Sequence, residues 1–377
     1  MRILGIETSC DETGAAVIEG ESKNKKVTLV SNVLASSLSF HSKTGGIIPE
    51  TAAREQIKYI IPVIEQVLSE SKSSKKKIVN RKSSIINLAS IDAIAVTVGP
   101  GLIGSLLVGV ETAKTLSYIY KIPIIPVNHL FGHIYANFIG KIHNSAADVQ
   151  FPAIALIVSG GHTDLVLIEN HQKIKWLGGT RDDAAGEAFD KIGRLLNLSY
   201  PGGPSIEKAA KAGNPKTFRF PRPLINSNDF DFSFSGLKTA VFREVQTMKS
   251  PQMRDPVAAG QLSNETISDI SASVQEAIVD VLIYKTLKAA QKYKVKSILL
   301  GGGVAANQKL RDELKLKIEN SPASTSEAGR AKLKIQFFVP EKWLCTDNAA
   351  MIASAAFYNY KPVPWNKITA NPELYFY

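Results

Sequence analysis

The feature that most constrains the fold is an internal repeat. Residues 1–20 (MRILGIETSCDETGAAVIEG) have the pattern of an apolar strand, a turn of small and hydroxylated residues, and a second strand. Residues 151–170 (FPAIALIVSGGHTDLVLIEN) have the same pattern later in the chain. Two such segments predict two strand–turn–strand units of similar structure.

A second repeat follows each of these segments. Residues 91–116 (IDAIAVTVGPGLIGSLLVGVETAKTL) have the pattern of a buried strand, a glycine-rich turn and a helix, and residues 295–315 (VKSILLGGGVAANQKLRDELK) repeat it. Together the repeats predict a duplicated α/β domain with a cleft between its halves. Between them we expect amphipathic helices over residues 51–71, with Ile57 and Ile61 on the apolar face, and over residues 275–292.

Length and composition agree with such a chain. At 377 residues it is long for one compact domain, and a hydrophobic content of 44% with 21% charged residues is typical of globular proteins. No apolar run approaches the roughly 20 residues of a membrane-spanning helix, so we expect no membrane partner. Two cysteines far apart in sequence indicate no disulfide framework and favour a reducing compartment.

The net charge of +11 makes nucleic acid a natural partner, although solvated lysines on an ordinary surface would give the same excess. Part of the charge lies in Lys72–Lys82 (KSSKKKIVNRK), which we predict to be a surface loop. Ser321–Lys332 (SPASTSEAGRAK) has no core-forming pattern and is predicted to be a second surface insertion.

Glycine-rich turns are the first candidate binding elements. In Ser159–Thr163 (SGGHT) the glycines let backbone N–H groups approach an anion, and the two hydroxyl groups add donors. The matching turn at Thr8–Thr13 suggests that two such turns cradle a polyphosphate. Each could equally be an ordinary structural turn.

His129 and His133 are the candidate metal ligands. Spaced i and i+4 on a helix, their imidazoles project from one face and can share an ion, although two packed or surface histidines would show the same spacing. A zinc protease of the HExxH type needs glutamate directly after the first histidine. Leu130 occupies that position, so the sequence argues against peptidase activity.

Three further segments carry candidate site residues. Asp347, at the start of a helix, could supply a carboxylate to a metal or act only as an N-cap. In residues 182–207, Asp190 could bind a ribose hydroxyl or belong to a solvated helix face, and Gly202–Gly203 permits close approach of a ligand. Asn307, after three consecutive glycines, could hydrogen-bond a base or sugar, or simply follow a tight turn.

Together these segments resemble one family, the TsaD proteins, which are tRNA N6-adenosine threonylcarbamoyltransferases. The motifs that carry the resemblance extend over nearly the whole chain in the family's order, and DDAAGEAFDK resembles the bacterial and organellar branch. They are GIETSCDETGAAV, GGIIPE, GPGLIGSLLVG, NHLFGH, LIVSGGHT, DDAAGEAFDK, YPGGP, DFSFSGLKTA, GGGVAAN and CTDNAAMIA.

The resemblance implies a two-lobed actin/hexokinase/Hsp70-like ATPase fold. We expect an N-terminal lobe over residues 1–128, a C-terminal lobe over residues 129–348 that carries the metal and nucleotide motifs, and a C-terminal helix and tail over residues 349–377 that pack back toward the N-terminal lobe.

The resemblance also implies the site residues. His129, His133 and Asp347 match the ligands of one divalent ion, iron or zinc. Catalytic positions match Ser9, Asp11 and Glu12. Positions that hold ATP, AMP or threonylcarbamoyl-AMP match Ile157, Val158, Ser159, Gly160, Gly161, Asp190, Gly203, Glu207 and Asn307.

The implied reaction transfers the threonylcarbamoyl group from threonylcarbamoyl-AMP, supplied by a separate synthase, to N6 of adenosine 37 in ANN-decoding tRNAs. The low-complexity insertions and the basic charge suit a homodimeric mitochondrial matrix protein, with a bacterial-type cytoplasmic protein as the second choice. A sugar or polyol kinase of the same fold, which does not need the three metal ligands, and a non-catalytic RNA-binding protein are the alternatives.

Overall fold

A computed structural model describes residues 1–21, 26–44, 46–71, 86–140, 149–249, 262–320 and 335–376. The two predicted surface insertions, Lys72–Lys82 and Ser321–Lys332, lie outside these residues. The chain forms two compact units: unit 1 comprises Met1–Val149 and Pro340–Tyr377, and unit 2 comprises Gln150–Val339. Each unit is built on one sheet.

Unit 1 has a six-stranded sheet in the order β5-β4-β1-β2-β3-β6. β1 pairs antiparallel with β2 and parallel with β4, while β4 pairs parallel with β5. The strands are β1 (Arg2–Glu7), β2 (Glu12–Glu21), β3 (Lys26–Ser36), β4 (Ala93–Gly99), β5 (Ile124–Asn128) and β6 (Ile139–Gly140).

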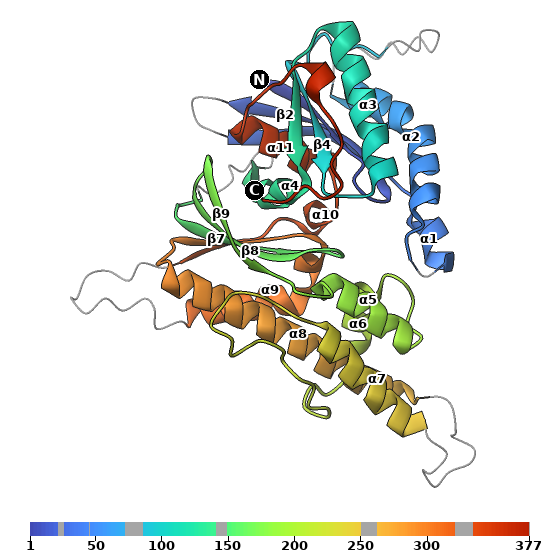
Figure 1. Ribbon diagram of the computed structural model, residues 1–377, viewed down its shortest axis with the longest axis vertical. Helices are drawn as coiled ribbons and strands as arrows, with labels where there is room; N and C mark the ends of the chain where they lie inside the picture. Colours follow the sequence, from blue (N-terminus) through green and yellow to red (C-terminus); the bar gives the residue numbers. More distant parts are fainter. Residues whose placement is uncertain are drawn as a thin grey trace, which may run out of the picture. The chain divides into compact units, whose positions relative to one another are not determined.

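Helices cover both faces of this sheet (Figure 1). On one face, Leu4 and Ile6 of β1 join a core with α2 (Pro49–Glu70) and α3 (Ile103–Tyr120). On the other face, Gly5 lies so close to Ala349 of α11 (Ala349–Tyr358) that a Cβ atom would meet its carbonyl oxygen. Because α11 is rich in alanine, its backbone can approach the sheet this closely. α1 (Leu38–Thr44) precedes α2 in the chain.

Unit 2 repeats the topology of unit 1. Its five-stranded sheet has the order β11-β10-β7-β8-β9, with β7 antiparallel to β8 and parallel to β10. The first five strands of unit 1 thus match those of unit 2 one for one, which confirms the duplication predicted from sequence. The strands are β7 (Ala153–Val158), β8 (Thr163–Asn170), β9 (Lys173–Gly179), β10 (Ser297–Gly301) and β11 (Gln336–Phe338).

The helices of unit 2 are centred on α8 (Asn264–Lys292), which packs on β7 and begins at the N-cap Ser263. It starts earlier than the helix expected over residues 275–292. The others are α5 (Ala185–Leu195), α6 (Gly202–Ala210), α7 (Ser235–Lys249) and α9 (Gln308–Glu319).

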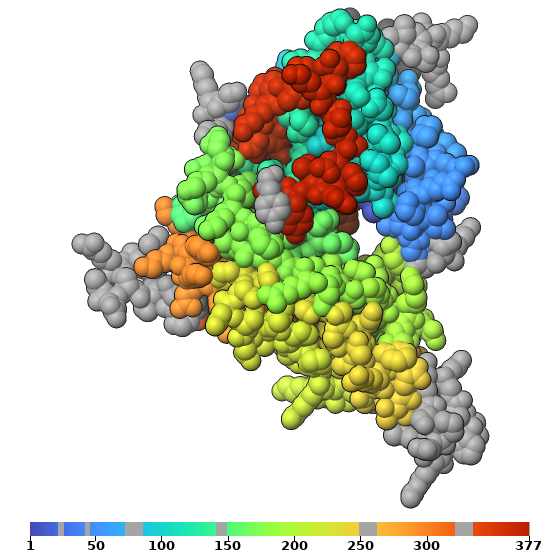
Figure 2. Space-filling view, in the orientation of Figure 1, coloured from blue at the N-terminus to red at the C-terminus, as the bar shows by residue number. Residues whose placement is uncertain are grey.

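The units divide the chain differently from the expected boundaries after residues 128 and 348. α4 (His129–Tyr135) packs against α11, so residues 129–149 and 340–348 belong to unit 1 together with both chain ends. The last residues lie on the surface of unit 1 beside α3, where Trp365 contacts Tyr118 with ring centroids 5.0 Å apart (Figure 2).

One helix face was assigned too widely from sequence. α2 buries Gln56, Ile60, Val63 and Val67, whereas Ile57 and Ile61 are 65% and 41% exposed. The two isoleucines lie beside the face that contacts the sheet, because a helix on a flat sheet buries only a stripe of its surface.

Candidate functional site

α4 presents two imidazoles to one place in unit 1. β5 ends at Asn128, whose side chain accepts a hydrogen bond of 2.8 Å from the N–H of Leu130 and caps the helix. His129 therefore stands at the first position of α4 and His133 one turn later. Their ring centroids are 4.7 Å apart with 79° between the ring planes, and both side chains are buried.

Asp347 completes the cluster. Its Oδ1 lies 3.4 Å from Nε2 of His129 and 3.3 Å from Nε2 of His133, and the three candidate ligand atoms lie within 4.8 Å of one another. The N-cap of α11 is Asn348, which accepts from the N–H of Met351 at 3.0 Å. Asp347 is therefore not the N-cap of α11, and its carboxylate faces the two imidazoles instead.

These residues fit a divalent ion. The His133 ring is 0% exposed, and its Nε2 faces Oδ1 of Asp347 at 3.3 Å without a well-formed hydrogen bond among the described residues. A buried nitrogen that is poorly hydrogen-bonded costs free energy, which a metal bond to Nε2 would offset. Two imidazole nitrogens and one carboxylate oxygen form a donor set that suits iron or zinc.

The electrostatics of the cluster also favour a cation. Burial alone would raise the pKa of Asp347, but the two imidazoles outweigh it and hold that pKa well below its usual range. Burial acts to lower the pKa of His129, yet the carboxylates of Asp347 and Glu7 raise it well above the ordinary value. The pKa of His133 is lowered, first by burial and also by the charge of His129. A metal ion at Nε2 of His129 would therefore compete with a proton for that nitrogen.

The turn that carries Ser9, Asp11 and Glu12 lies beside these residues. Oγ of Ser9 is 3.2 Å from Nδ1 of His129. The pKa of Glu12 is raised well above its ordinary value, first by burial and then by the charges of Asp347 and Asp11. The structure thus brings the predicted catalytic turn and the predicted metal ligands together within unit 1.

Gln56, which sequence reasoning missed, holds this turn in place. Its Nε2 donates to the carbonyl oxygens of Thr8, Cys10 and Glu12 at 3.3, 3.1 and 2.9 Å. Ser105 Oγ donates to the carbonyl of Cys10 at 2.9 Å. A polar residue among the apolar residues of a helix was the available signal for Gln56.

Glycine turns in unit 2 leave open space at the ends of two parallel strands. β7 runs into Ser159–Gly161, and β10 runs into Gly302–Gly303. A Cβ atom added at Gly160, Gly161 or Gly303 would meet no heavy atom within 4 Å, and the same holds for Gly203. Ligands of open α/β sheets bind outside the carboxyl ends of the strands, so this space fits the predicted nucleotide.

Ile157 and Val158 have buried side chains in β7, so only their backbone could contact a ligand. Gly302 has φ +91°, and a Cβ there would meet the backbone of Val158. Glycine is therefore required at this position.

The side chains of the other three predicted nucleotide-binding residues form hydrogen bonds with backbone N–H groups at the starts of α6 and α9. Oδ1 of Asp190 accepts from the N–H of Gly202 at 2.7 Å, and burial raises the pKa of Asp190. Glu207 accepts from the N–H of Gln308 at 2.9 Å. Asn307 caps α9 and donates to Gln275 at 2.8 Å. Contact of these side chains with a nucleotide stays a prediction.

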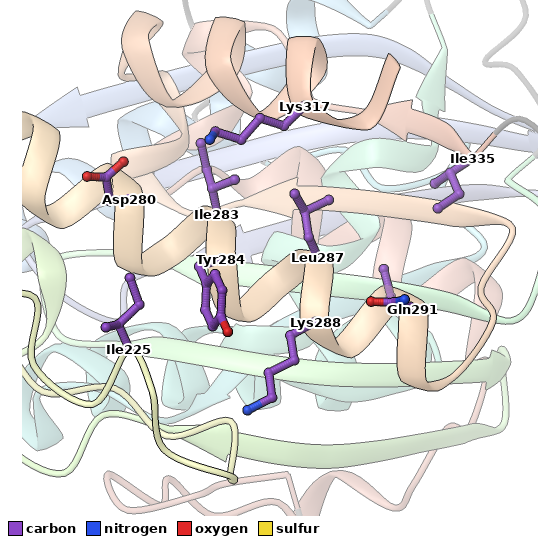
Figure 3. A pocket seen from close by; sticks show the side chains of 10 residues that line it. Ile225, Asp280, Ile283, Tyr284, Leu287, Lys288, Gln291, Lys317 and Ile335 are labelled. Atoms are coloured by element: carbon purple, nitrogen blue, oxygen red, sulfur yellow. The ribbon is translucent and has the colours of Figure 1, made fainter. Parts of the chain in front are cut away.

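A separate surface pocket of about 340 Å³ lies along α8 (Figure 3). Tyr284, Leu287 and Lys288 of α8, with Lys317 of α9, contribute to its lining. None of the predicted site residues lines this pocket, so it belongs neither to the candidate metal site nor to the predicted nucleotide site.

A duplicated α/β unit with glycine turns at its strand ends defines the actin/hexokinase-like ATPase fold, and the cluster in unit 1 adds a candidate metal site. Two solved structures support the fold alone. Full-length HypF in the phosphate- and nucleotide-bound form has a TM-score of 0.55 at 11% identity, covering 95% of this chain and 55% of that one. HypF of T. kodakarensis has a TM-score of 0.56 at 13% identity, covering 95% and 47%.

The chain belongs to the TsaD family, whose description is tRNA N6-adenosine threonylcarbamoyltransferase and whose profile matches residues 28–354. Proteins with that name are similar over nearly their whole length. The one from Desulfitobacterium hafniense is 46% identical over 377 residues, covering 99% of this chain and 97% of its own. Those from Syntrophomonas wolfei and Moorella thermoacetica are 45% and 44% identical, each covering 95% of this chain and 92% of its own.

These relatives are bacterial, so they give no support to the predicted mitochondrial location and are consistent with the second choice, a bacterial-type cytoplasmic protein. Nothing in them favours a polyol kinase or a non-catalytic RNA-binding protein. Among the described residues, no helix has the length and apolar character needed to cross a membrane.

Proposed function

We propose that this chain transfers the threonylcarbamoyl group from threonylcarbamoyl-AMP to N6 of adenosine 37 in ANN-decoding tRNAs. The observation that carries the proposal is the meeting of His129, His133 and Asp347 beside the turn Ser9–Glu12. This arrangement occurs in a chain that matches the TsaD family over most of its length. The net charge of +11 suits a tRNA substrate.

Three residues of unit 1 would hold the ion. Nε2 of His129, Nε2 of His133 and Oδ1 of Asp347 are the donor atoms. A divalent ion bound there would supply Lewis-acid chemistry, either polarising the carbamoyl carbonyl or neutralising the leaving phosphate. Iron and zinc both accept this donor set.

Glycine turns of unit 2 would bind the nucleotide part of the substrate. Gly160 and Gly161 expose backbone N–H groups for the phosphate, and the Ser159 hydroxyl adds a further donor. Gly203 and Gly303 leave space where a side chain would obstruct a base or sugar. Asp190, Glu207 and Asn307, which flank these turns, are proposed to contact the sugar or base.

The transfer forms one bond and breaks another. The N6 amine attacks the carbamoyl carbon, a C–N bond forms, the C–O bond of the mixed anhydride breaks, and AMP leaves with that electron pair. The amine must lose a proton, and we assign its acceptance to Asp11 or Glu12. Burial and the charges of Asp347 and Asp11 raise the pKa of Glu12, so its carboxylate, when ionised, is a stronger base than that of an ordinary glutamate. We also assign Ser9 to the reaction centre, because its hydroxyl lies 3.2 Å from Nδ1 of His129.

The proposal includes the predicted partners. The chemistry requires a source of threonylcarbamoyl-AMP, which we assign to a separate synthase. We also propose a homodimer, to be tested by light scattering of the purified protein.

The direct test is reconstitution. The protein is incubated with threonine, bicarbonate, ATP, a synthase and unmodified tRNA, and the digested nucleosides are separated by mass. We expect threonylcarbamoyladenosine with the wild-type protein and none with Asp11→Asn/Glu12→Gln, which should still bind nucleotide. The assignment would be contradicted if the folded, metal-loaded wild-type protein were inactive both alone and with bacterial partner proteins added.

A further inference from the structure

Glu7 is a buried carboxylate to which the proposed reaction assigns no role. It is the last residue of β1, and its side chain is 0% exposed. Burying a carboxylate is costly unless its oxygens accept hydrogen bonds. The residues around Glu7 therefore indicate what keeps it there.

Each oxygen of Glu7 has defined partners. Oε1 accepts from the backbone N–H of Ser9 at 2.6 Å. Oε2 accepts from the hydroxyl of Thr97 at 2.6 Å and lies 3.3 Å from Nδ1 of His129. One side chain thus joins the start of the catalytic turn to the first candidate metal ligand.

We propose that Glu7 is a positioning residue that prepares His129 to bind the metal. A carboxylate oxygen only accepts, so its contact with Nδ1 requires the proton on that nitrogen. In the neutral ring that a metal binds, Nε2, on the Asp347 side, then carries the free electron pair. Carboxylates that hold a ligating histidine in this way orient the ring and strengthen the ligand. The inference rests on the metal site of the proposed function.

The hydroxyl of Ser9 does not change this assignment. Its Oγ also lies 3.2 Å from Nδ1, but a hydroxyl both donates and accepts, so it adapts to either tautomer. Of the two groups that face Nδ1, only Glu7 requires a proton on that nitrogen.

A glutamine at this position should reverse the tautomer. The N–H of Ser9 is a backbone donor on the Oε1 side, so the introduced amide must place its oxygen there. Its NH₂ group then occupies the position of Oε2 and donates to Nδ1 of His129. The proton moves to Nε2, which loses the electron pair needed for the metal. Glu7→Gln therefore removes more than charge.

The test measures the dissociation constant of Zn²⁺ by chelator competition, with circular dichroism of the metal-free proteins to establish folding. We expect Glu7→Gln to weaken Zn²⁺ binding about 10–100-fold. The control, Glu55→Gln, makes the same change at a buried glutamate on α2 that pairs with Lys58, and should leave the affinity unchanged. Equal affinity of folded Glu7→Gln and wild type overturns the proposal.

A second measurement needs no Glu7 variant. In Zn²⁺-loaded wild-type protein with ¹⁵N-labelled histidine, long-range ¹H–¹⁵N correlation should show the proton of His129 on Nδ1 and the metal on Nε2. The signals are assigned by their loss in His129→Ala. Metal on Nδ1 overturns the proposal.

The failures of the two proposals are distinguishable. Wild-type protein that does not bind Zn²⁺ overturns the metal site and with it the role of Glu7. Wild-type protein that binds Zn²⁺ but produces no modified tRNA overturns the transfer alone, because the role of Glu7 is judged by affinity and tautomer.

Discussion

Gln56 offers a test of whether the catalytic turn is held from α2. Its single NH₂ group faces the carbonyl oxygens of Thr8, Cys10 and Glu12, and carries two protons, so it satisfies two of the three at a time. Each such bond contributes about 0.5–1.5 kcal/mol net, so Gln56→Met should lower the free energy of unfolding by about 1–3 kcal/mol. Gln56→Glu should cost more, because a carboxylate would face three carbonyl oxygens.

The assay is urea unfolding of the metal-free protein, followed by the rate of tRNA modification. Gln66→Met is the matched control, since Gln66 lies on the same helix and is exposed, and among the described residues its side chain hydrogen-bonds only to Glu70. The rate should fall about tenfold or more in Gln56→Met, because small displacements of catalytic groups are costly. Stability within about 0.5 kcal/mol of the control, with an unchanged rate, would refute the reasoning.

Three further predictions follow from the structure. Zn²⁺ affinity, measured by chelator competition across pH, should fall as the pH drops below the raised pKa of His129, because protons then compete for the ligand; an affinity independent of pH contradicts this. Asp182→Ala should lose about 1–2 kcal/mol in urea unfolding, because that carboxylate accepts hydrogen bonds at the start of α7. Burial acts to raise the pKa of Asp182, but the hydrogen bonds outweigh it and lower that pKa. The stabilisation of the folded state by Asp182 is therefore present above the unfolded pKa and is lost as the pH falls through the lower folded pKa. Equal acid sensitivity of the variant and the wild type contradicts this. Gly302→Ala should destabilise unit 2 by about 1–3 kcal/mol, since φ is +91° and Val158 blocks the Cβ, whereas Gly160→Ala should keep its stability and weaken AMP binding in calorimetry; the reverse ranking would contradict the proposed nucleotide position.

The fold was predictable because its signal is local. Apolar strands around glycine turns occur twice, and the two sheets have the same order over five strands. The division into units was less accessible, because residues 129–149 join unit 1 through the contact of α4 with α11, and such packing has no local signature. The exposure of Ile57 and Ile61 likewise depends on how much of α2 the sheet covers.

The candidate site was predictable in part. Helical spacing indicated that His129 and His133 share a face, whereas for Asp347 the sequence left a metal ligand and an N-cap as alternatives, and the family resemblance favoured the ligand. Spacing also could not show that Asn348, rather than Asp347, caps α11. Sequence reasoning missed Glu7 and Gln56 because most of their side-chain partners lie far away in the chain. A glutamate that ends an apolar strand was the one hint for Glu7.

Unit 1 is discontinuous, and its candidate metal ligands come from both of its segments. His129 and His133 belong to Met1–Val149, Asp347 belongs to Pro340–Tyr377, and the whole of unit 2 is encoded between them. During translation the ribosome therefore completes unit 2 before the third ligand emerges. A nascent or truncated polypeptide that ends before Asp347 offers an ion only two imidazoles, so the candidate metal site is completed only late in synthesis.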